Sequence, residues 1–295
     1  MSSRATLTLL TLSLIWGCSF IFIKVGVESF SPIEIAFIRT LLGSIIILTI
    51  VSVKRLEYPH GARTWYRLAV AAAISNTIPF ALFGYGETHI SAILAGLLNA
   101  MTPLVTFPVA ILAGVERSSS RRIVGLALGF VGVLVVLGVG SNIAGGSLLG
   151  SAACLLAATL YGIGFVYVRK SLVITDNNRL GLAGGQLAMA AVEALIPMTL
   201  TSHTAHVINS RSVIAVLLLG IFGTGLAYVL NYALIHQVGA LGASLTPLIM
   251  PIFSTIAGAV VLGEHLIWYQ GLGAALILTG AWFVQRKPTI PSTPG

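Results

Sequence analysis

The sequence predicts an all-α membrane protein of ten transmembrane helices, built as two inverted five-helix repeats with both termini in the cytoplasm. Its composition, the placement of its charges and an internal repeat predict this fold class. Hydrophobic residues make up 57% of the 295 residues and charged residues only 8%, whereas an average soluble domain carries about 25% charged residues. With a mean hydropathy of +0.99, this composition excludes a soluble enzyme, a nucleic-acid-binding module and a disordered protein.

Each expected helix is an apolar segment of about the length that a bilayer requires, roughly 20 residues. The segments span residues 5–24, 32–53, 65–86, 90–114, 122–140, 147–168, 180–202, 212–235, 240–262 and 267–285. The seventh segment is the weakest candidate for a membrane helix, because it contains the polar residues Gln186 and Glu193. We expect this helix to break near Pro197. The tail, residues 287–295, is rich in Pro, Ser and Thr and is predicted to be disordered.

The basic residues are distributed unevenly between the two ends of these segments. If the N-terminus is cytoplasmic, thirteen of the sixteen Lys and Arg residues fall on the cytoplasmic side. They are Arg4, Lys54, Arg55, Arg63, Arg67, Arg117, Arg121, Arg122, Arg169, Lys170, Arg179, Arg286 and Lys287. Lys24 and Arg211 fall on the other side, and Arg39 lies within the second segment. This positive-inside pattern predicts a multi-pass protein of the cytoplasmic (inner) membrane whose basic loops face anionic lipid.

The two halves of the chain share residues at a fixed spacing of 148 positions. The matched residues are Pro103, Glu116, Gly125, Ala127, Leu128 and Gly132 with Pro251, Glu264, Gly273, Ala275, Leu276 and Gly280. We therefore expect two repeats, residues 5–140 and 147–286. Because five helices is an odd number, the second repeat enters the membrane from the opposite side. Inverted repeats are typical of secondary transporters, whose substrate site lies near the membrane midplane between the repeats.

Several motifs give the chain a specific resemblance. In the first half they are Trp16-Gly17, Lys24, Arg39, the proline of the fourth segment and Glu116 before a Gly-rich fifth segment. In the second half they are Tyr232-Ala-Leu, Gly239-Ala, Thr246-Pro and Gly263-Glu264. Over nearly its whole length the sequence resembles the EamA family of the drug/metabolite transporter superfamily. The resemblance implies ten helices in inverted halves and the export of amino acids or related metabolites. Val115 departs from it by replacing the glycine before Glu116, and the seventh segment has no counterpart of Arg39.

Polar and aromatic residues recur at helical spacing along four segments. They include Phe80, Thr106, Thr224 and Ser254 together with most of the candidates below. The substrate-binding candidates are Trp16, Asn76, Phe83, Asn99, Thr102, Tyr161, Tyr228, Asn231, Tyr232, Ser244 and Thr246. Since polar groups are costly in hydrocarbon, each either lines a central cavity or bonds to a neighbouring helix. Aromatic walls suit an apolar or aromatic solute, and amide and hydroxyl groups suit its amino or carboxylate group.

Four prolines are predicted to kink the helices and to act as gating bends, because proline removes a helical hydrogen bond. They are Pro79, Pro103, Pro247 and Pro251. Two charges need a further explanation. Glu193, the only acid predicted deep in a membrane segment, is either a coupling site, a partner for a cationic group or an interfacial residue. Arg39 either binds an anionic substrate, reaches an interface or pairs with Glu34. Glu116 and Glu264 are expected to form cap or loop contacts.

These features favour a secondary transporter of small organic solutes that exports amino acids or related metabolites by alternating access. An uptake carrier for a vitamin or nucleotide-like metabolite is the alternative. We expect no enzyme, because no paired acids or nucleophile and base lie at membrane depth, and we expect no cofactor. We expect no metal, because the His203-x-x-His206 pair lacks a third ligand. The glycines Gly125, Gly129, Gly132, Gly271, Gly273 and Gly280 suit close packing within one half or with a second protomer in a homodimer.

Overall fold

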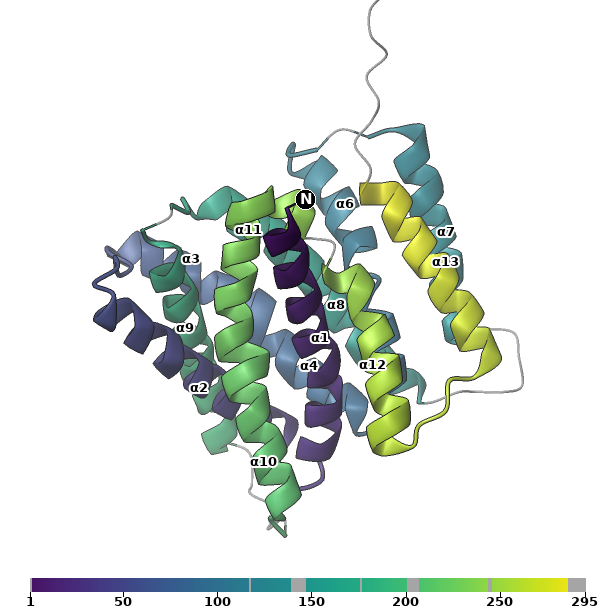
Figure 1. The fold of residues 1–295 in the computed structure, drawn as a ribbon, viewed down its shortest axis with the longest axis horizontal. Coiled ribbons are helices and arrows are strands. Elements are labelled where there is room, and N and C mark those ends of the chain that lie inside the picture. Colours follow the sequence, from purple (N-terminus) through teal and green to yellow (C-terminus); the bar gives the residue numbers. More distant parts are fainter. Residues whose placement is uncertain are drawn as a thin grey trace, which may run out of the picture.

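A computed structural model describes residues 2–116, 118–138, 147–175, 177–200, 207–243 and 246–285. Within these ranges every secondary-structure element is a helix and no strand occurs (Figure 1). Seven helical spans among the described residues are long and apolar enough to cross a membrane. The predicted class, an all-helical membrane protein, is therefore confirmed at this level. The inverted arrangement of the halves and the orientation of the termini stay predictions.

Each of the ten predicted segments coincides with a helical span. The first half contains α1 (Ser3–Gly26), α2 (Pro32–Val53), α3 (Ala62–Ala72), η1 (Ala73–Thr77), α4 (Ile78–Glu87), α5 (Ala92–Asn99), α6 (Thr102–Leu112) and α7 (Ser120–Val136). The second half contains α8 (Leu148–Ser171), α9 (Arg179–Leu200), α10 (Ser210–Leu218), η2 (Leu219–Leu226), α11 (Ala227–Ala243), α12 (Thr246–Leu262) and α13 (Trp268–Gln285). Short elements combine into longer spans, such as Ala62–Glu87, Ala92–Leu112 and Ser210–Leu234.

Two of the predicted boundaries are wrong. The helix α9 continues through Pro197 to Leu200 instead of breaking there. One proline removes a single hydrogen bond, whereas a break in hydrocarbon would leave several backbone groups without partners. The eighth span was expected to end at residue 235, but α11 continues past Gly239 to Ala243. A glycine inside a helix costs only about 1 kcal/mol, so it does not by itself end one.

Wide π-helical turns interrupt the third span of each half, η1 in the first and η2 in the second. In the first half, Pro79 follows η1 and has no N–H to donate to the carbonyl of Ser75, one turn earlier. In the second half, the Thr224 hydroxyl donates to the Leu219 carbonyl at 3.1 Å. Turns of this kind are frequent at functional sites, and both belong to spans that reach the cavity described below.

The helix ends form two faces. The N-terminal face is the one at which α1 begins, and the far face is the one at which α1 ends. On the far face, Lys24 at the end of α1 donates to the backbone carbonyls of Glu87 and Ile90. On the N-terminal face, Arg67 donates to the carbonyl of Ser171 at 2.8 Å. These bonds tie loops from different helices together at each end of the molecule.

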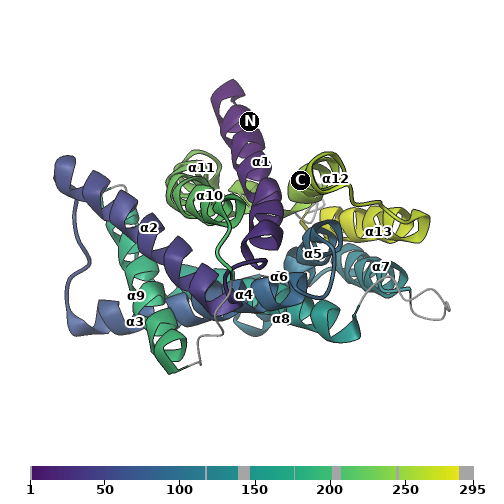
Figure 2. The same cartoon turned by 90° about the horizontal axis from the view of Figure 1, so that it is seen from below.

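Helices α7 and α13 lie side by side at one edge of the molecule (Figures 1 and 2). A Cβ atom on Gly280 would lie 2.5 Å from the Gly129 nitrogen, and one on Gly132 would lie 2.7 Å from the Gly273 carbonyl oxygen. The glycines therefore let the two backbones touch. This contact joins the two halves, which was not expected, whereas Gly129 also packs within its own half against Leu104 of α6. A homodimer through these helices would have to use their outer faces.

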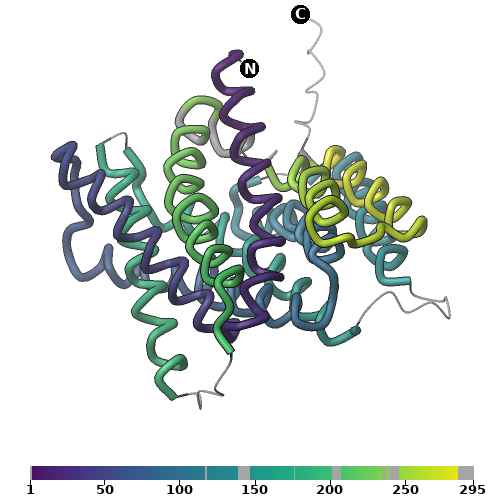
Figure 3. Tube along the Cα trace, turned by 60° about the horizontal axis from the view of Figure 1, so that its bottom comes forward, coloured from purple at the N-terminus to yellow at the C-terminus, as the bar shows by residue number. Residues whose placement is uncertain are grey.

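Helix α1 packs along α12 and beside α10 and α11 (Figure 3). At Gly17, a Cβ atom would lie 2.7 Å from Phe253 of α12. At Gly162 in α8, a Cβ atom would lie 3.0 Å from Val105 of α6. Val105 and Phe253 are 148 positions apart, the spacing of the sequence repeat. The contact of α1 with α12 thus has a counterpart in the contact of α8 with α6.

Candidate functional site

A cavity of about 160 Å³ lies among helices of both halves. A single water molecule needs roughly 10–15 Å³ of cavity volume. The cavity is many times larger, so it has room for a small organic solute. It is lined by Trp16, Ser19, Phe20, Ile23, Arg39, Ser75, Phe80, Phe83, Asn99, Thr102, Tyr161, Gly164, Phe165, Val168, Ile174, Gln186, Tyr228, Asn231, Tyr232, Pro247 and Met250. No lining residue comes from the described parts of α7 or α13. That pair packs the halves together away from the cavity.

Aromatic rings form much of the cavity wall. Phe83 stacks on Tyr161 with ring centroids 5.7 Å apart, and Phe20 meets Phe83 edge-on at 5.5 Å. Trp16 and Tyr228 meet edge-on at 6.4 Å, and the Trp16 indole N–H donates to the Gly223 carbonyl at 3.1 Å. The rings come from α1, α4, α8 and α11, so both halves contribute to one apolar surface.

Arg39 brings a positive charge to this wall. Its side chain is buried, with the guanidinium carbon 3.7 Å from the centre of the Phe80 ring. Its Nε donates to the Thr224 hydroxyl at 3.1 Å, and no carboxylate among the described residues pairs with it. The pairing with Glu34 is therefore absent, and Glu34 instead closes a capping box with Ser31. The guanidinium keeps donors for a bound solute.

A short hydrogen-bond chain runs behind the aromatic wall. The Gln186 amide donates to the Asn76 side-chain oxygen at 2.6 Å, and the Asn76 amide donates to the Tyr228 hydroxyl. Asn76 is fully buried in η1, so it holds Tyr228 in place. The Gln186 Oε1 atom accepts no hydrogen bond from the described residues.

The structure brings most of the predicted site residues together. The cavity-lining ones are Trp16, Arg39, Phe83, Asn99, Thr102, Tyr161, Tyr228, Asn231, Tyr232 and Pro247. Asn76 and Thr246 are buried without lining the cavity. Ser244 lies outside the described residues. The lining residues that sequence reasoning missed include Phe20, Gln186 and Met250, and only Gln186, a polar residue in an apolar segment, carried a visible signal.

The predicted prolines lie at or near helix interruptions. Pro103 is in the first turn of α6, directly after the break between α5 and α6. Its missing N–H leaves the Asn99 carbonyl free to accept from the Thr102 hydroxyl at 2.8 Å. Pro79 follows η1, and Pro247 lies in the first turn of α12. Pro251 lies inside α12 without ending it.

A second buried acid lies at the end of a membrane span, whereas Glu193 was expected to be the only acid deep within one. Glu87, the last residue of the span Ala62–Glu87, is 0% exposed. The sequence hid it because the third segment was expected to end one residue earlier. Glu193 itself is half-buried, accepts a hydrogen bond from the Thr77 hydroxyl at 2.7 Å, and does not line the cavity.

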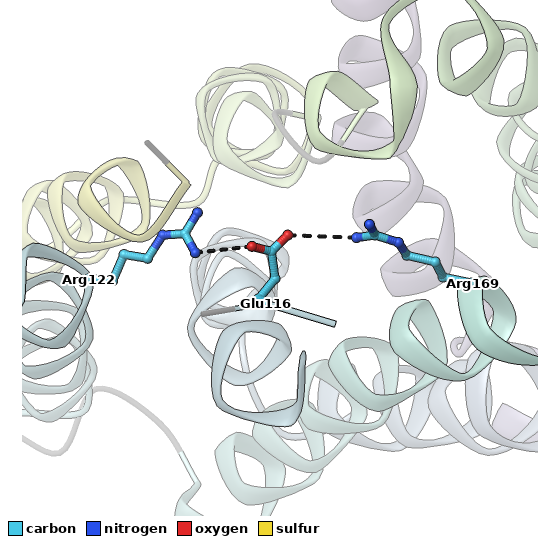
Figure 4. A network of polar contacts seen from close by, with 3 residues as sticks. All are labelled: Glu116, Arg122 and Arg169. Carbon is cyan, nitrogen blue, oxygen red and sulfur yellow. Dashed lines mark hydrogen bonds and ion pairs between the residues drawn. The ribbon is translucent and has the colours of Figure 1, made fainter. Parts of the chain in front are cut away.

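Glu264 and Glu116 have different partners. Glu264 accepts from the backbone N–H groups of Ala92 and Ile93, at 2.8 and 2.9 Å, at the start of α5. Glu116 pairs with Arg122 at 3.2 Å and with Arg169 at 3.7 Å (Figure 4). The expected cap contact is thus found at Glu264, and Glu116 instead bridges two arginines from α7 and α8.

The described residues contain no group of three or more His, Cys, Asp and Glu side chains that could hold a metal ion. The pair His203 and His206 lies outside the described residues. Cys18 and Cys154 are free thiols in α1 and α8.

Comparisons with known proteins agree with a transport function. A model described as the EamA-like transporter family matches residues 3–138 and 148–286. An uncharacterized transporter of Archaeoglobus fulgidus is 26% identical over 97% of this chain and 99% of its own length. A probable amino-acid metabolite efflux pump of Escherichia coli is 24% identical over 96% of this chain and 95% of its own. A solved crystal structure shares the fold, with a TM-score of 0.67 and 19% identity over 96% of each chain.

Proposed function

Because the chain belongs to the EamA-like transporter family, we propose that it is a secondary transporter that exports amino acids or related metabolites across the cytoplasmic membrane. A relative from Escherichia coli, matched along almost its whole length, is a probable amino-acid metabolite efflux pump. The observation that carries the proposal is the cavity between the halves, which combines an aromatic wall with the buried guanidinium of Arg39.

The cavity suits a zwitterion with an apolar side chain. The guanidinium of Arg39 has no carboxylate partner among the described residues, so it is ready to bind a substrate carboxylate as a charge-assisted pair. The side-chain amide of Asn231, which lines the cavity, offers an acceptor for an ammonium group. The rings of Trp16, Phe83 and Tyr161 give an apolar surface for the side chain and for cation–π contact.

We also propose that the two halves are inverted repeats that rock about this cavity, with the N-terminal face in the cytoplasm. The matched contacts of Gly17 and Gly162 and the paired π turns support two equivalent halves. Thirteen basic residues on one side support the orientation. Alternating access by such repeats around a midplane site is the mechanism that this architecture supports.

A transport assay tests the proposed substrate class. The purified protein in liposomes is offered radiolabelled amino acids, amines, flavins and nucleosides. We expect uptake of amino acids with apolar or aromatic side chains and a loss of about tenfold or more in Arg39→Gln, because a charge-assisted bond contributes about 1.5–3 kcal/mol. The exposed Arg211 is the matched control, and Arg211→Gln should transport normally. Movement of flavins or nucleosides alone would favour the uptake carrier, and transport of no solute would refute the proposal.

Cysteine labelling tests the orientation. In a background without Cys18 and Cys154, we place single cysteines at the exposed positions Ser118 and His265. A membrane-impermeant maleimide applied to intact cells should label the His265→Cys variant but not the Ser118→Cys variant. Labelling of both from outside would contradict the inverted arrangement.

A further inference from the structure

Glu87, at the end of α4, is the one acid of this structure's described residues that is both completely buried and unbonded. Its side chain is 0% exposed, and neither carboxylate oxygen has a hydrogen-bond partner among the residues that the structure describes. An ionised carboxylate in that position would lose its water without any compensating hydrogen bond, which costs several kcal/mol or more. A carboxyl group that carries a proton avoids this cost. The observed conformation therefore accommodates the protonated form of Glu87.

The ammonium group of Lys24 bonds to backbone carbonyls and not to the Glu87 carboxylate. The Lys24 ammonium donates to the backbone carbonyl of Glu87 at 2.6 Å and to that of Ile90 at 2.7 Å. These carbonyls lie at the C-terminal end of α4, where helical partners are lacking. Lys24 thus fastens the end of α1 to the end of α4 on the far face, and it makes no ion pair with the Glu87 carboxylate.

The groups that act on Glu87 come from each neighbouring element. They are Lys24 from α1, Arg39 from α2, the thiol of Cys154 from α8 and Glu264 from the loop before α13. Glu264 is held at the start of α5 by two backbone N–H groups, and Arg39 lies against Phe80. None of these groups forms a hydrogen bond or an ion pair with the carboxylate. Lys24, Glu264 and Arg39 instead bond or pack elsewhere.

Glu87 also lies close to the substrate cavity along its own helix. Phe83, one helical turn earlier, lines the cavity and stacks on Tyr161. A change in the protonation of Glu87 can therefore be transmitted to the cavity through a single turn of α4. Toward the far face, the Glu87 carbonyl accepts a hydrogen bond from Lys24.

We propose that Glu87 is a proton-binding site that couples export to proton entry. When the far face opens, water reaches the carboxylate, and the Lys24 ammonium leaves the two carbonyls to pair with it. Binding of one proton from the far side neutralises the carboxylate, releases Lys24 to the carbonyls and allows the far face to close. The same proton leaves toward the cavity before the next opening, so one proton enters for each solute that leaves. This inference rests on the proposed transport function.

Infrared difference spectroscopy of the purified protein tests the proton site without any solute. We expect a protonated-carboxyl band that shifts in heavy water, is lost in Glu87→Gln and remains in Glu193→Gln. Glu193 is the matched control because it lies within a membrane span but outside the cavity. Absence of the band in the unmodified protein, or its survival in Glu87→Gln, would overturn the proposal. If Glu87→Gln does not fold, Glu87→Asp should move the band, and an unmoved band would overturn it equally.

Transport in liposomes then tests the coupling. An imposed proton gradient should accelerate solute movement in the unmodified protein and in Glu193→Gln. In Glu87→Gln the gradient should no longer accelerate transport, and exchange of labelled for unlabelled solute should also slow, because glutamine mimics the protonated acid, which keeps the far face closed. Gradient-driven transport by Glu87→Gln would overturn the coupling. A band with the expected behaviour in a protein that moves no solute would refute the proposed function and leave the proton site standing.

Discussion

Glu116 and Glu264 occupy matched positions in the two halves, yet they hold different partners. Their backbone N–H groups make equivalent bonds. The amide of Glu116 donates to the Ala110 carbonyl and that of Glu264 to the Gly258 carbonyl, each at 3.2 Å. Gly114, two residues before Glu116, and Gly263, directly before Glu264, have φ angles of +69° and +66°. Both helices therefore end with a left-handed glycine, but this glycine lies one position earlier in the first half.

On the far face, Glu264 crosses from the second half to the first. Its carboxylate accepts hydrogen bonds from the N–H groups of Ala92 and Ile93. The Ser91 hydroxyl accepts one from the N–H group of Leu94 at 3.1 Å. The donors at the start of α5 that lack a helical acceptor are thus all bonded, and the negative charge lies at the positive end of the helix dipole. This contact joins the two halves on the far face.

On the N-terminal face, the equivalent contact is not made. The positions that match Ala92 and Ile93 are Ala240 and Leu241, which lie inside α11 rather than at a helix start. Their N–H groups are therefore engaged in the helix. Glu116 instead pairs with Arg122 and Arg169. The comparison teaches that one sequence motif joins the two halves through backbone groups on one face and binds charged side chains on the other.

The largest effect should come from removing the crossing carboxylate. In Glu264→Ala, two buried N–H groups of α5 lose their acceptor, which we expect to cost about 2–4 kcal/mol of stability. Thermal unfolding in detergent measures the loss, and labelling of a cysteine in the cavity from the far side should rise. Glu116→Ala is the matched control and should cost clearly less. Equal losses in the two variants would remove the distinction between the faces.

A pair of intermediate effects compares the left-handed glycines at the two helix ends. Gly114→Ala and Gly263→Ala each force a side chain into a left-handed conformation, which costs about 1–2 kcal/mol. A Cβ atom at either position meets nothing within 4 Å, so no clash adds to the cost. We expect the two variants to lower the unfolding temperature by similar amounts. A clear inequality would show that the one-residue shift of the left-handed glycine changes the strain at the helix end.

The helices of this fold could be predicted because the bilayer demands long apolar segments, and the resemblance to the EamA family is confirmed by the family match. The boundary errors arose from local rules that hydrocarbon overrides. Pro197 and Gly239 read as breaks, yet the helices continue because backbone groups inside a membrane need their hydrogen bonds.

The candidate site was predictable where a residue type is costly in hydrocarbon. Arg39, Asn99 and Tyr228 stood out for this reason, and all three line the cavity. Phe20 and Met250 resemble ordinary core residues, so only the three-dimensional structure assigns them to the cavity. Glu87 was hidden for another reason. Its burial depends on Lys24 and on neighbouring helices distant in sequence, which no local pattern encodes.

The smallest effect should come from the outer partner of Glu116. The Arg169 side chain is 56% exposed and lies 3.7 Å from the carboxylate, so solvent screens the pair and Arg169→Ala should cost less than about 1 kcal/mol. The loss should shrink further at high salt. Arg122 is buried and lies near the Phe107 ring, so Arg122→Ala should cost more and respond less to salt. Unfolding temperatures at low and high ionic strength measure both. If Arg169→Ala proves as costly as Glu264→Ala, the N-terminal face is held as firmly as the far face, and the asymmetry between the two glutamates carries no meaning for transport.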